Sequence, residues 1–103
     1  SLEYVERPIS GERALAISKI EAHYFMHNCF ISENYIVNNI YKISKIPAVI
    51  VQGRHDVICP PFNALKLSKI WKSATIEIVE DAGHSAFEVN IARKLISALE
   101  IIK

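Results

Sequence analysis

The sequence predicts an α/β fold, and three observations carry that prediction. The largely apolar runs 48–51 and 75–79 have the length of strands. A segment with apolar residues at helical spacing follows each run, which gives the order strand, helix, strand, helix. The first run, Ala-Val-Ile-Val, is continuously apolar, as a strand covered on both faces is. This order is typical of a parallel βαβα unit with a right-handed crossover.

The first part of the chain predicts helices and loops. Residues 1–11 contain proline and glycine and are expected to form a loop or linker. Apolar residues at helical spacing predict a helix over about 12–27. After a break over 28–31, a second helix is expected over about 33–42, and Pro47 ends any helix before the first strand.

The second part supplies the strands and their helices. A strand is expected over 48–52. A pair of prolines beginning at Pro60 opens a helix that continues to about residue 72, since first-turn N–H groups have no intrahelical partner to lose. The next strand covers 74–79, and the last helix begins at Glu88 or Asn90.

Length and patterning indicate that this unit is part of something larger. The 103 residues make at most one domain, and half of them are hydrophobic, so a packed core is expected. Two parallel strands cannot form a sheet covered on both faces, so the chain needs more strands than it has. A start at Ser1 rather than Met fits the interior or C-terminal part of a longer chain. Uncovered sheet surface predicts self-association or poor solubility of the chain alone.

Charge and cysteine content exclude several classes of function. The net charge is +1 and the basic residues are scattered, so neither nucleic acid nor an anionic membrane is expected as a partner. No apolar run approaches the roughly 20 residues of a membrane span, and the N-terminus lacks the features of a signal peptide. Cys29 and Cys59 are too few for a disulfide framework and have no metal-binding CxxC spacing. We therefore expect a cytoplasmic protein with reduced thiols.

An acid and an imidazole lie where the two predicted strands end. Asp56 follows the first strand, and His84 follows the second, 28 residues later. Because the carboxyl ends of parallel strands meet at one edge of a sheet, the two side chains are expected to meet there. A carboxylate that accepts one imidazole N–H leaves the other nitrogen free to take a proton from a nucleophile. Taken singly, Asp56 could cap a helix and His84 could be a turn residue, but together they favour a catalytic triad.

The nucleophile of such a triad is absent from these residues. No two of the three glycines are four residues apart, so the Gly-x-Ser-x-Gly elbow cannot occur. Cys59 lies three residues after Asp56 but is expected to be a small buried residue rather than a reactive thiol. Gly83 is expected to provide a tight turn that frees His84 to point into a cleft. The chain alone is therefore expected to be inactive.

These segments are specific enough to resemble a family, the proline iminopeptidases. The run Pro-Ala-Val-Ile-Val-Gln-Gly-Arg-His-Asp-Val-Ile-Cys-Pro over 47–60 is similar to their acid-bearing strand and loop. The run Ala-Gly-His-Ser-Ala-Phe-Glu over 82–88 is similar to their histidine loop. Ala-Leu-Ala at 14–16 and Ile-Glu-Ala-His-Tyr-Phe at 20–25 resemble their final cap-region helix. The resemblance spans roughly residues 12–103.

The resemblance implies the C-terminal third of a serine aminopeptidase of the α/β-hydrolase fold. Residues 1–45 would be the end of the cap region with connecting helices, and 46–103 the C-terminal βαβα part of the core. Asp56 matches the family's triad acid, His84 its triad base, and Glu21 a glutamate that binds the substrate's free α-amine. The implied substrates are peptides with an N-terminal proline, hydrolysed without metal or cofactor. A solvent-facing helix glutamate is the alternative for Glu21.

Departures from the family pattern leave two other interpretations open. His55 stands where the family often has an aromatic residue and Ala48 where it often has glycine, and the serine elbow and oxyanion-hole loop have no counterpart here. The chain could therefore be a non-catalytic relic or interaction module of α/β-hydrolase origin. It could also derive from a hydrolase of other specificity, such as an esterase or an epoxide hydrolase.

Overall fold

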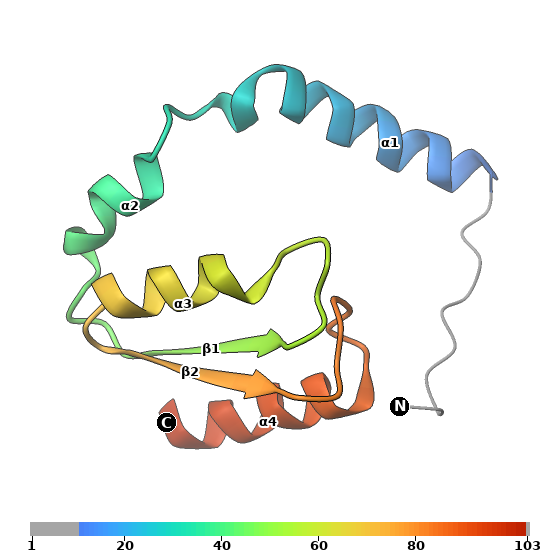
Figure 1. The fold of residues 1–103 in the computed structure, drawn as a ribbon. Coiled ribbons are helices and arrows are strands. Elements are labelled where there is room, and N and C mark those ends of the chain that lie inside the picture. The colour runs from blue at the N-terminus through green and yellow to red at the C-terminus, as the bar shows by residue number, and fades with distance from the viewer. Residues whose placement is uncertain (1–10, 103) are drawn as a thin grey trace.

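The computed structural model describes residues 11–102 as helices around a small parallel sheet (Figure 1). The predicted loop over residues 1–11 lies outside this range, except that Gly11 already begins a helix. In chain order the elements are α1 (Gly11–Met26), η1 (Asn28–Phe30), α2 (Tyr35–Asn39), η2 (Ile40–Lys42), β1 (Ala48–Gly53), α3 (Pro61–Ile70), β2 (Ala74–Val79) and α4 (Val89–Ile102).

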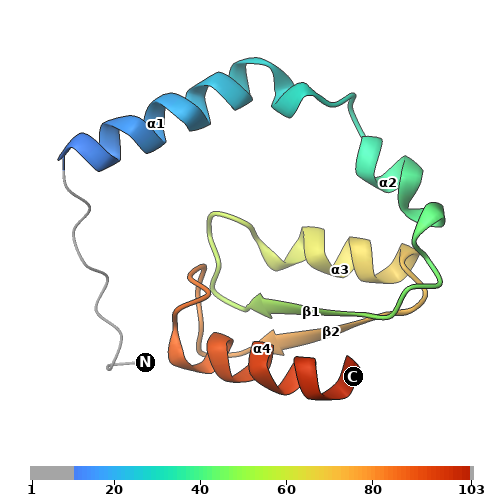
Figure 2. The same cartoon turned by 180° about the vertical axis from the view of Figure 1, so that it is seen from behind.

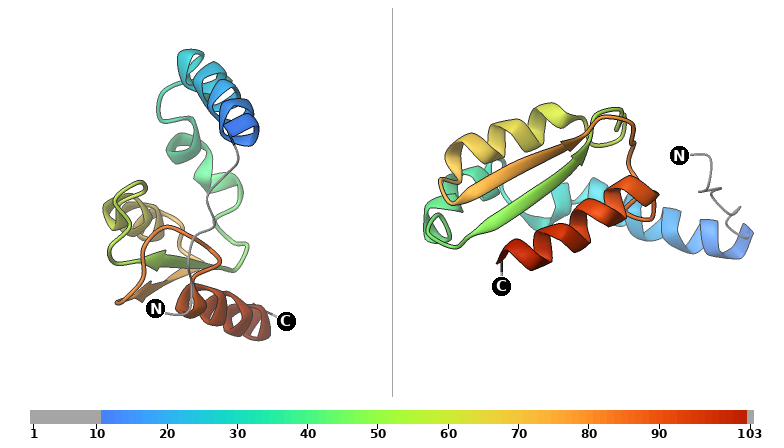
Figure 3. Two further views of the ribbon diagram at one scale, coloured as in Figure 1. Left: turned by 90° about the vertical axis from the view of Figure 1, so that its right-hand side faces the viewer. Right: turned by 90° about the horizontal axis from the view of Figure 1, so that it is seen from below.

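The predicted strand–helix–strand–helix unit is confirmed. β1 and β2 pair in parallel, from Ala48 opposite Ala74 to Gly53 opposite Val79. Helix α3 connects them on one face of the sheet, and α4 lies on the other face, as Figures 1 and 2 show from opposite sides. The two views of Figure 3 confirm that the sheet lies between these two helices. The parallel pairing brings both strand ends, and the loops that follow them, to the same edge.

The ends of α3 are set by local chemistry. Pro60 has an extended backbone, with φ −58° and ψ 147°, and Pro61 occupies the first helical turn, where its missing N–H costs no intrahelical bond. The helix ends at Ile70, two residues before the predicted end, where the Trp71 N–H donates to the Leu67 carbonyl at 2.9 Å. The Trp71 indole N–H also donates to the Ile46 carbonyl at 3.0 Å, which ties this end of α3 to the start of β1.

The first part of the chain departs from one predicted detail. The helix and the break after it are confirmed, but the second helix is shorter than expected: α2 has 5 residues and continues as the 3₁₀ turn η2. Asn34 precedes α2 with φ 59°, a left-handed conformation that cannot continue a helix from residue 33. Left-handed values at Asn28, Cys29 and Phe30 make the break. The ring of His27 stacks on that of Phe30 at 4.8 Å between centroids.

Helix α1 contributes no buried residue to the molecule. It runs in an arc with α2 beside the α/β unit rather than packing on it (Figures 1 and 3). Apolar side chains such as Phe25 and Met26 are exposed on it. No helix within residues 11–102 is long and apolar enough to cross a membrane.

The hydrophobic core is small. Val79, Ala82 and Ile91 form its buried cluster, with the half-buried Val51 packed against them. No large side chain within residues 11–102 is fully buried. The sequence predicted a packed core from its hydrophobic content, but two strands offer too little sheet to bury it.

Candidate active site

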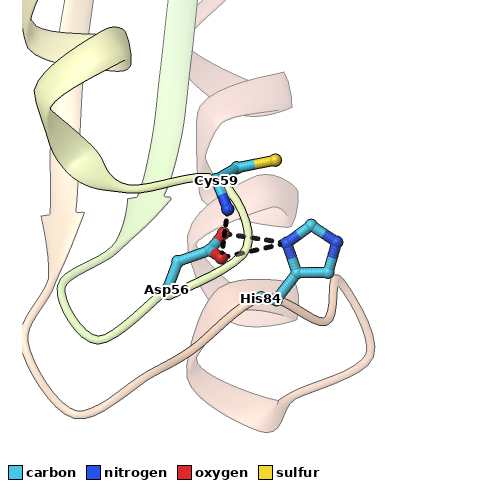
Figure 4. Close-up of side chains that lie close together, drawn as sticks. All are labelled: Asp56, Cys59 and His84. Atoms are coloured by element: carbon cyan, nitrogen blue, oxygen red, sulfur yellow. Dashed lines mark hydrogen bonds and ion pairs between the residues drawn. The ribbon is translucent and has the colours of Figure 1, made fainter. Parts of the chain in front are cut away.

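Asp56 and His84 meet at the carboxyl edge of the sheet, as predicted from the strand order. Asp56 lies in the loop after β1 and His84 in the loop after β2 (Figure 4). The His84 Nδ1 atom is 2.9 Å from Asp56 Oδ2 and 3.1 Å from Oδ1. An ionised carboxylate can only accept, so this pairing assigns the proton to Nδ1 and leaves Nε2 as an acceptor. Nε2 points away from Asp56 in Figure 4 and is open to a reaction partner.

The loop backbone holds Asp56 in its ionised form. Its side chain is only 7% exposed, and its Oδ1 atom accepts N–H groups from Ile58 at 3.0 Å and Cys59 at 2.8 Å. Burial raises the pKa of Asp56, but the Cys59 N–H, the hydrogen bond and charge of His84, and the Ile58 N–H together outweigh it. The pKa of this carboxyl therefore lies below its ordinary value. Because Oδ1 is taken by the backbone, Oδ2 is the atom that faces His84 most closely.

The two loops approach each other so closely that one of them requires a glycine. A Cβ atom on Gly53 would lie 2.7 Å from the Ala82 carbonyl oxygen and would also overlap the Gly83 carbonyl. The backbone joins the loops at this point, because Arg54 N–H donates to the Val79 carbonyl and His55 N–H to the Ala82 carbonyl, both at 2.9 Å. The sequence prediction assigned the special glycine to Gly83. The structure assigns it to Gly53, since a Cβ on Gly83 would make only ordinary contacts, with the Glu88 carboxylate at 3.4 Å and the His55 carbonyl oxygen at 4.0 Å.

Two polar side chains that the sequence reasoning missed support the loops. The Gln52 amide donates to the carbonyls of Gly53 and Cys59, both at 3.0 Å, across the base of the Asp56 loop. The Glu88 carboxylate accepts the Gly83 N–H at 3.0 and 3.2 Å, next to His84. The sequence offers only weak signals for these two roles. Gln52 is a polar residue at the end of an apolar strand, and Glu88 follows a glycine-containing turn.

An ion pair between the first residues of the two loops, Arg54 and Glu80, adds little to their stability. The Arg54 guanidinium donates to both oxygens of Glu80 at 2.8 and 3.0 Å. The hydrogen bond and charge of this pair lower the pKa of Glu80 and raise that of Arg54. Both side chains are exposed, so water and salt screen the attraction.

Cys59 differs from its prediction. It was expected to be a small buried residue, but its side chain is exposed. The Cys59 backbone N–H donates to the Asp56 carboxylate, and the Cys59 side chain points away from that carboxylate (Figure 4). The Cys59 Sγ atom, a ring nitrogen of His84 and a carboxylate oxygen of Asp56 all lie within 4.8 Å of one another. These three atoms are of types that can bind a metal ion.

Glu21, the third predicted site residue, is not brought to this pair. It lies exposed on α1, which runs apart from the loops that carry Asp56 and His84 (Figure 1). No interaction joins it to either residue within the described range. A hollow after α1 is lined by residues from Phe25 to Glu33 and does not include it. The predicted role of Glu21 therefore stays a prediction.

Comparison with known proteins places these residues in context. No protein-family model matches the chain. A proline iminopeptidase of Arabidopsis thaliana is 42% identical to it over the whole chain. Proline iminopeptidases of Xylella fastidiosa and Neisseria gonorrhoeae are 44% and 43% identical over 84% and 86% of the chain.

The matched region is a minor part of each relative. The chain spans only 27% of the Arabidopsis protein, 28% of the Xylella protein and 29% of the Neisseria protein. The mixed α/β structure with its parallel strands agrees with the C-terminal part of an α/β-hydrolase. The chain is thus similar along nearly its whole length to the proline iminopeptidases, as the C-terminal part of one is expected to be.

Proposed function

We propose that this chain supplies the acid–base pair of a serine aminopeptidase that releases N-terminal proline from peptides. The observation that carries the proposal is the contact of 2.9 Å between His84 Nδ1 and the buried Asp56 carboxylate at the carboxyl edge of the sheet. The similarity to proline iminopeptidases supports the substrate class.

In this proposal His84 moves the proton and Asp56 orients it. With its Nδ1 proton held by Asp56, the neutral imidazole takes the proton of a serine hydroxyl at Nε2 as the hydroxyl attacks the prolyl carbonyl. The imidazolium that forms is stabilised by the adjacent carboxylate, and it then gives its proton to the leaving amine. The lowered pKa of Asp56 supports this role, because only the ionised acid stabilises the imidazolium.

Glu21 is proposed to bind the free α-amine of the substrate. An enzyme that removes one N-terminal residue must recognise a single positive charge at a fixed distance from the scissile carbonyl, and a carboxylate does so by charge-assisted hydrogen bonds. Glu21 is exposed on α1, with no described partner to occupy its carboxylate.

The serine is proposed to come from outside these 103 residues. Because the sequence contains no Gly-x-Ser-x-Gly, we expect the isolated chain to release no amine from a prolyl arylamide. Active-site titration measures how much contaminating peptidase a preparation contains. Turnover by the purified chain beyond what those contaminants explain would contradict this part of the proposal.

A chimera tests the roles of the named residues. The matched segment of the Xylella protein is replaced by this chain, and hydrolysis of a prolyl arylamide is measured. The chimera should be active, and His84→Gln should lower kcat by about 10³-fold or more, since the proton acceptor is lost. Glu21→Gln should raise KM for the arylamide about tenfold or more while sparing a neutral ester.

Glu12→Gln is the matched control, because Glu12 is exposed on the same helix and should leave both substrates unaffected. Equal loss on arylamide and ester after Glu21→Gln would favour a hydrolase of other specificity. An active chimera in which His84→Gln has no effect would remove the acid–base proposal altogether.

One observation favours a second candidate, an interaction module. The chain exposes many large apolar side chains, including Val57, Ile58, Phe62 and Phe87 around the two loops. Such a surface calls for a covering partner. An inactive chimera, together with tight binding of the chain to the rest of the Xylella protein, would favour this alternative.

A further inference from the structure

The loops that follow β1 and β2 bring three different metal-binding side chains together. Within residues 11–102, the carboxylate of Asp56, the thiol of Cys59 and the imidazole of His84 each place one donor atom within 4.8 Å of the other two. We propose that these three residues form a Zn²⁺ site. Figure 4 shows the three side chains close together at the loops. Cys59 is exposed and the His84 side chain is 50% exposed, whereas the Asp56 side chain is only 7% exposed, so an ion would reach the cluster from the side of Cys59 and His84.

The ligand chemistry selects the type of metal. Thiolate, imidazole and carboxylate are the three ligand types that proteins use for Zn²⁺, whereas Ca²⁺ and Mg²⁺ take oxygen ligands alone. A thiolate beside an imidazole further favours Zn²⁺ over Mn²⁺ or Mg²⁺. Three protein ligands leave one tetrahedral position for water.

The site needs only small movements of exposed side chains. Around a tetrahedral zinc ion, neighbouring donor atoms lie about 3.3–3.7 Å apart. The widest separation in the cluster must therefore close by about 1 Å, and the contact of 2.9 Å between Asp56 and His84 must open slightly. Cys59 is exposed, and the His84 side chain is 50% exposed, so both can move without repacking the core.

Asp56 provides the fixed point of the site. Its buried carboxylate is held at Oδ1 by the N–H groups of Ile58 and Cys59, which leaves Oδ2 free to face His84. Such hydrogen bonds to a ligating carboxylate orient it and strengthen metal binding. The same turn that holds Asp56 also sets the direction of the Cys59 side chain, because it is the Cys59 N–H that donates.

Zinc and the Asp56–His84 hydrogen bond exclude each other. When Nδ1 binds the metal, its proton passes through solvent to Nε2, and the thiol proton of Cys59 passes to the buffer. The ion is then bound by His84 Nδ1 and Asp56 Oδ2, the two atoms that the hydrogen bond joined. This consequence rests on the proposed function: zinc would block the acid–base pair and inhibit any enzyme that uses it.

Metal titration of the full chain tests the proposal without any peptide substrate. Co²⁺ reports a cobalt–thiolate absorption band, and calorimetry with Zn²⁺ gives affinity and stoichiometry. We expect one ion per chain, and Cys59→Ser should abolish the cobalt–thiolate band. Both Cys59→Ser and His84→Gln should weaken Zn²⁺ binding about tenfold or more. Cys29→Ser is the matched control, since Cys29 is the other exposed free cysteine of the described range and should be dispensable.

A second measurement uses the unmodified chain, so it does not depend on how a variant folds. Zn²⁺ should protect Cys59, but not Cys29, from alkylation by iodoacetamide, as mapped by mass spectrometry. Loss of the cobalt band in Cys29→Ser, equal protection of both thiols, or unchanged Zn²⁺ affinity in His84→Gln would overturn the site. None of these outcomes depends on peptidase activity, so failure here is distinguishable from failure of the proposed function.

Discussion

At the scale of single residues, Asp56 couples the candidate site to the stability of the fold. It is the one buried charged side chain of the described range, and it accepts hydrogen bonds from two backbone N–H groups and from His84. Its pKa is lower in the folded chain than its ordinary value of 3.8. Folding therefore stabilises the ionised carboxylate of Asp56 relative to its protonated form.

This shift predicts how stability depends on pH. A carboxyl whose pKa is lowered by folding stabilises the protein above its unfolded pKa, and that contribution is lost as pH falls through the folded value. The difference in unfolding free energy between the unmodified chain and Asp56→Asn should therefore be large at pH 7 and shrink below pH 3.8. Urea denaturation of both proteins at pH 7 and pH 3, in buffer with a chelator, measures it. If the difference in unfolding free energy between the two proteins is the same at pH 7 and pH 3, the ionised carboxylate of Asp56 does not stabilise the fold.

The position of Glu21 relative to Asp56 and His84 could not be predicted from the sequence pattern. The pairing of Asp56 with His84 could be predicted, because strand order alone brings the two strand ends to one edge. The position of Glu21 relative to them depends on how α1 packs, and α1 buries no residue in the described part of the molecule. A family resemblance can name such a residue, but local pattern cannot place it.

At the scale of elements, prediction succeeded where the determinants are local. The bounds of β2 were predicted as observed and those of α3 within about two residues, since apolar periodicity and proline position act over one or two turns. The shortening of α2 could not be predicted, because it depends on a left-handed conformation at Asn34. The need for a glycine at position 53 could not be predicted either, because it arises from backbone carbonyl groups in another loop.

That contact predicts a strong effect of a single methyl group. In Gly53→Ala the new Cβ would overlap the backbone carbonyls of Ala82 and Gly83, and backbone cannot rotate away as a side chain can. We expect a loss of stability of about 1–3 kcal/mol, the usual range for overpacking. We also expect the loops to separate, which lengthens the contact between Asp56 and His84.

Urea denaturation followed by circular dichroism measures the stability change, and the imidazole N–H proton resonance of His84 reports the contact. Gly11→Ala is the control, because a Cβ there meets nothing within 4 Å and alanine favours helices. If both variants unfold at the same denaturant concentration and keep the His84 resonance, the close approach of the loops does not constrain the site.

At the scale of the whole molecule, the fold leaves its sheet open. Each of the two strands pairs with only one neighbour, so each has one edge without a partner in the described sheet. Large apolar side chains are exposed on α1, α2, α3 and α4. Contiguous exposed apolar surface of this kind marks sites of interaction with another protein surface.

We expect the isolated chain to associate with itself. Open strand edges and exposed apolar helix faces both favour contact between copies, and a net charge of only +1 provides little repulsion. Sedimentation velocity over a hundredfold range of concentration should show a weight-average mass that rises with concentration, and 1 M salt should not reverse it, because apolar contacts are not screened. A single species of 11.6 kDa at every concentration would mean that the helices close over the sheet in solution. Addition of the remaining part of the Xylella protein should compete with self-association if both use the same exposed faces, and the oligomer should then give way to a mixed complex.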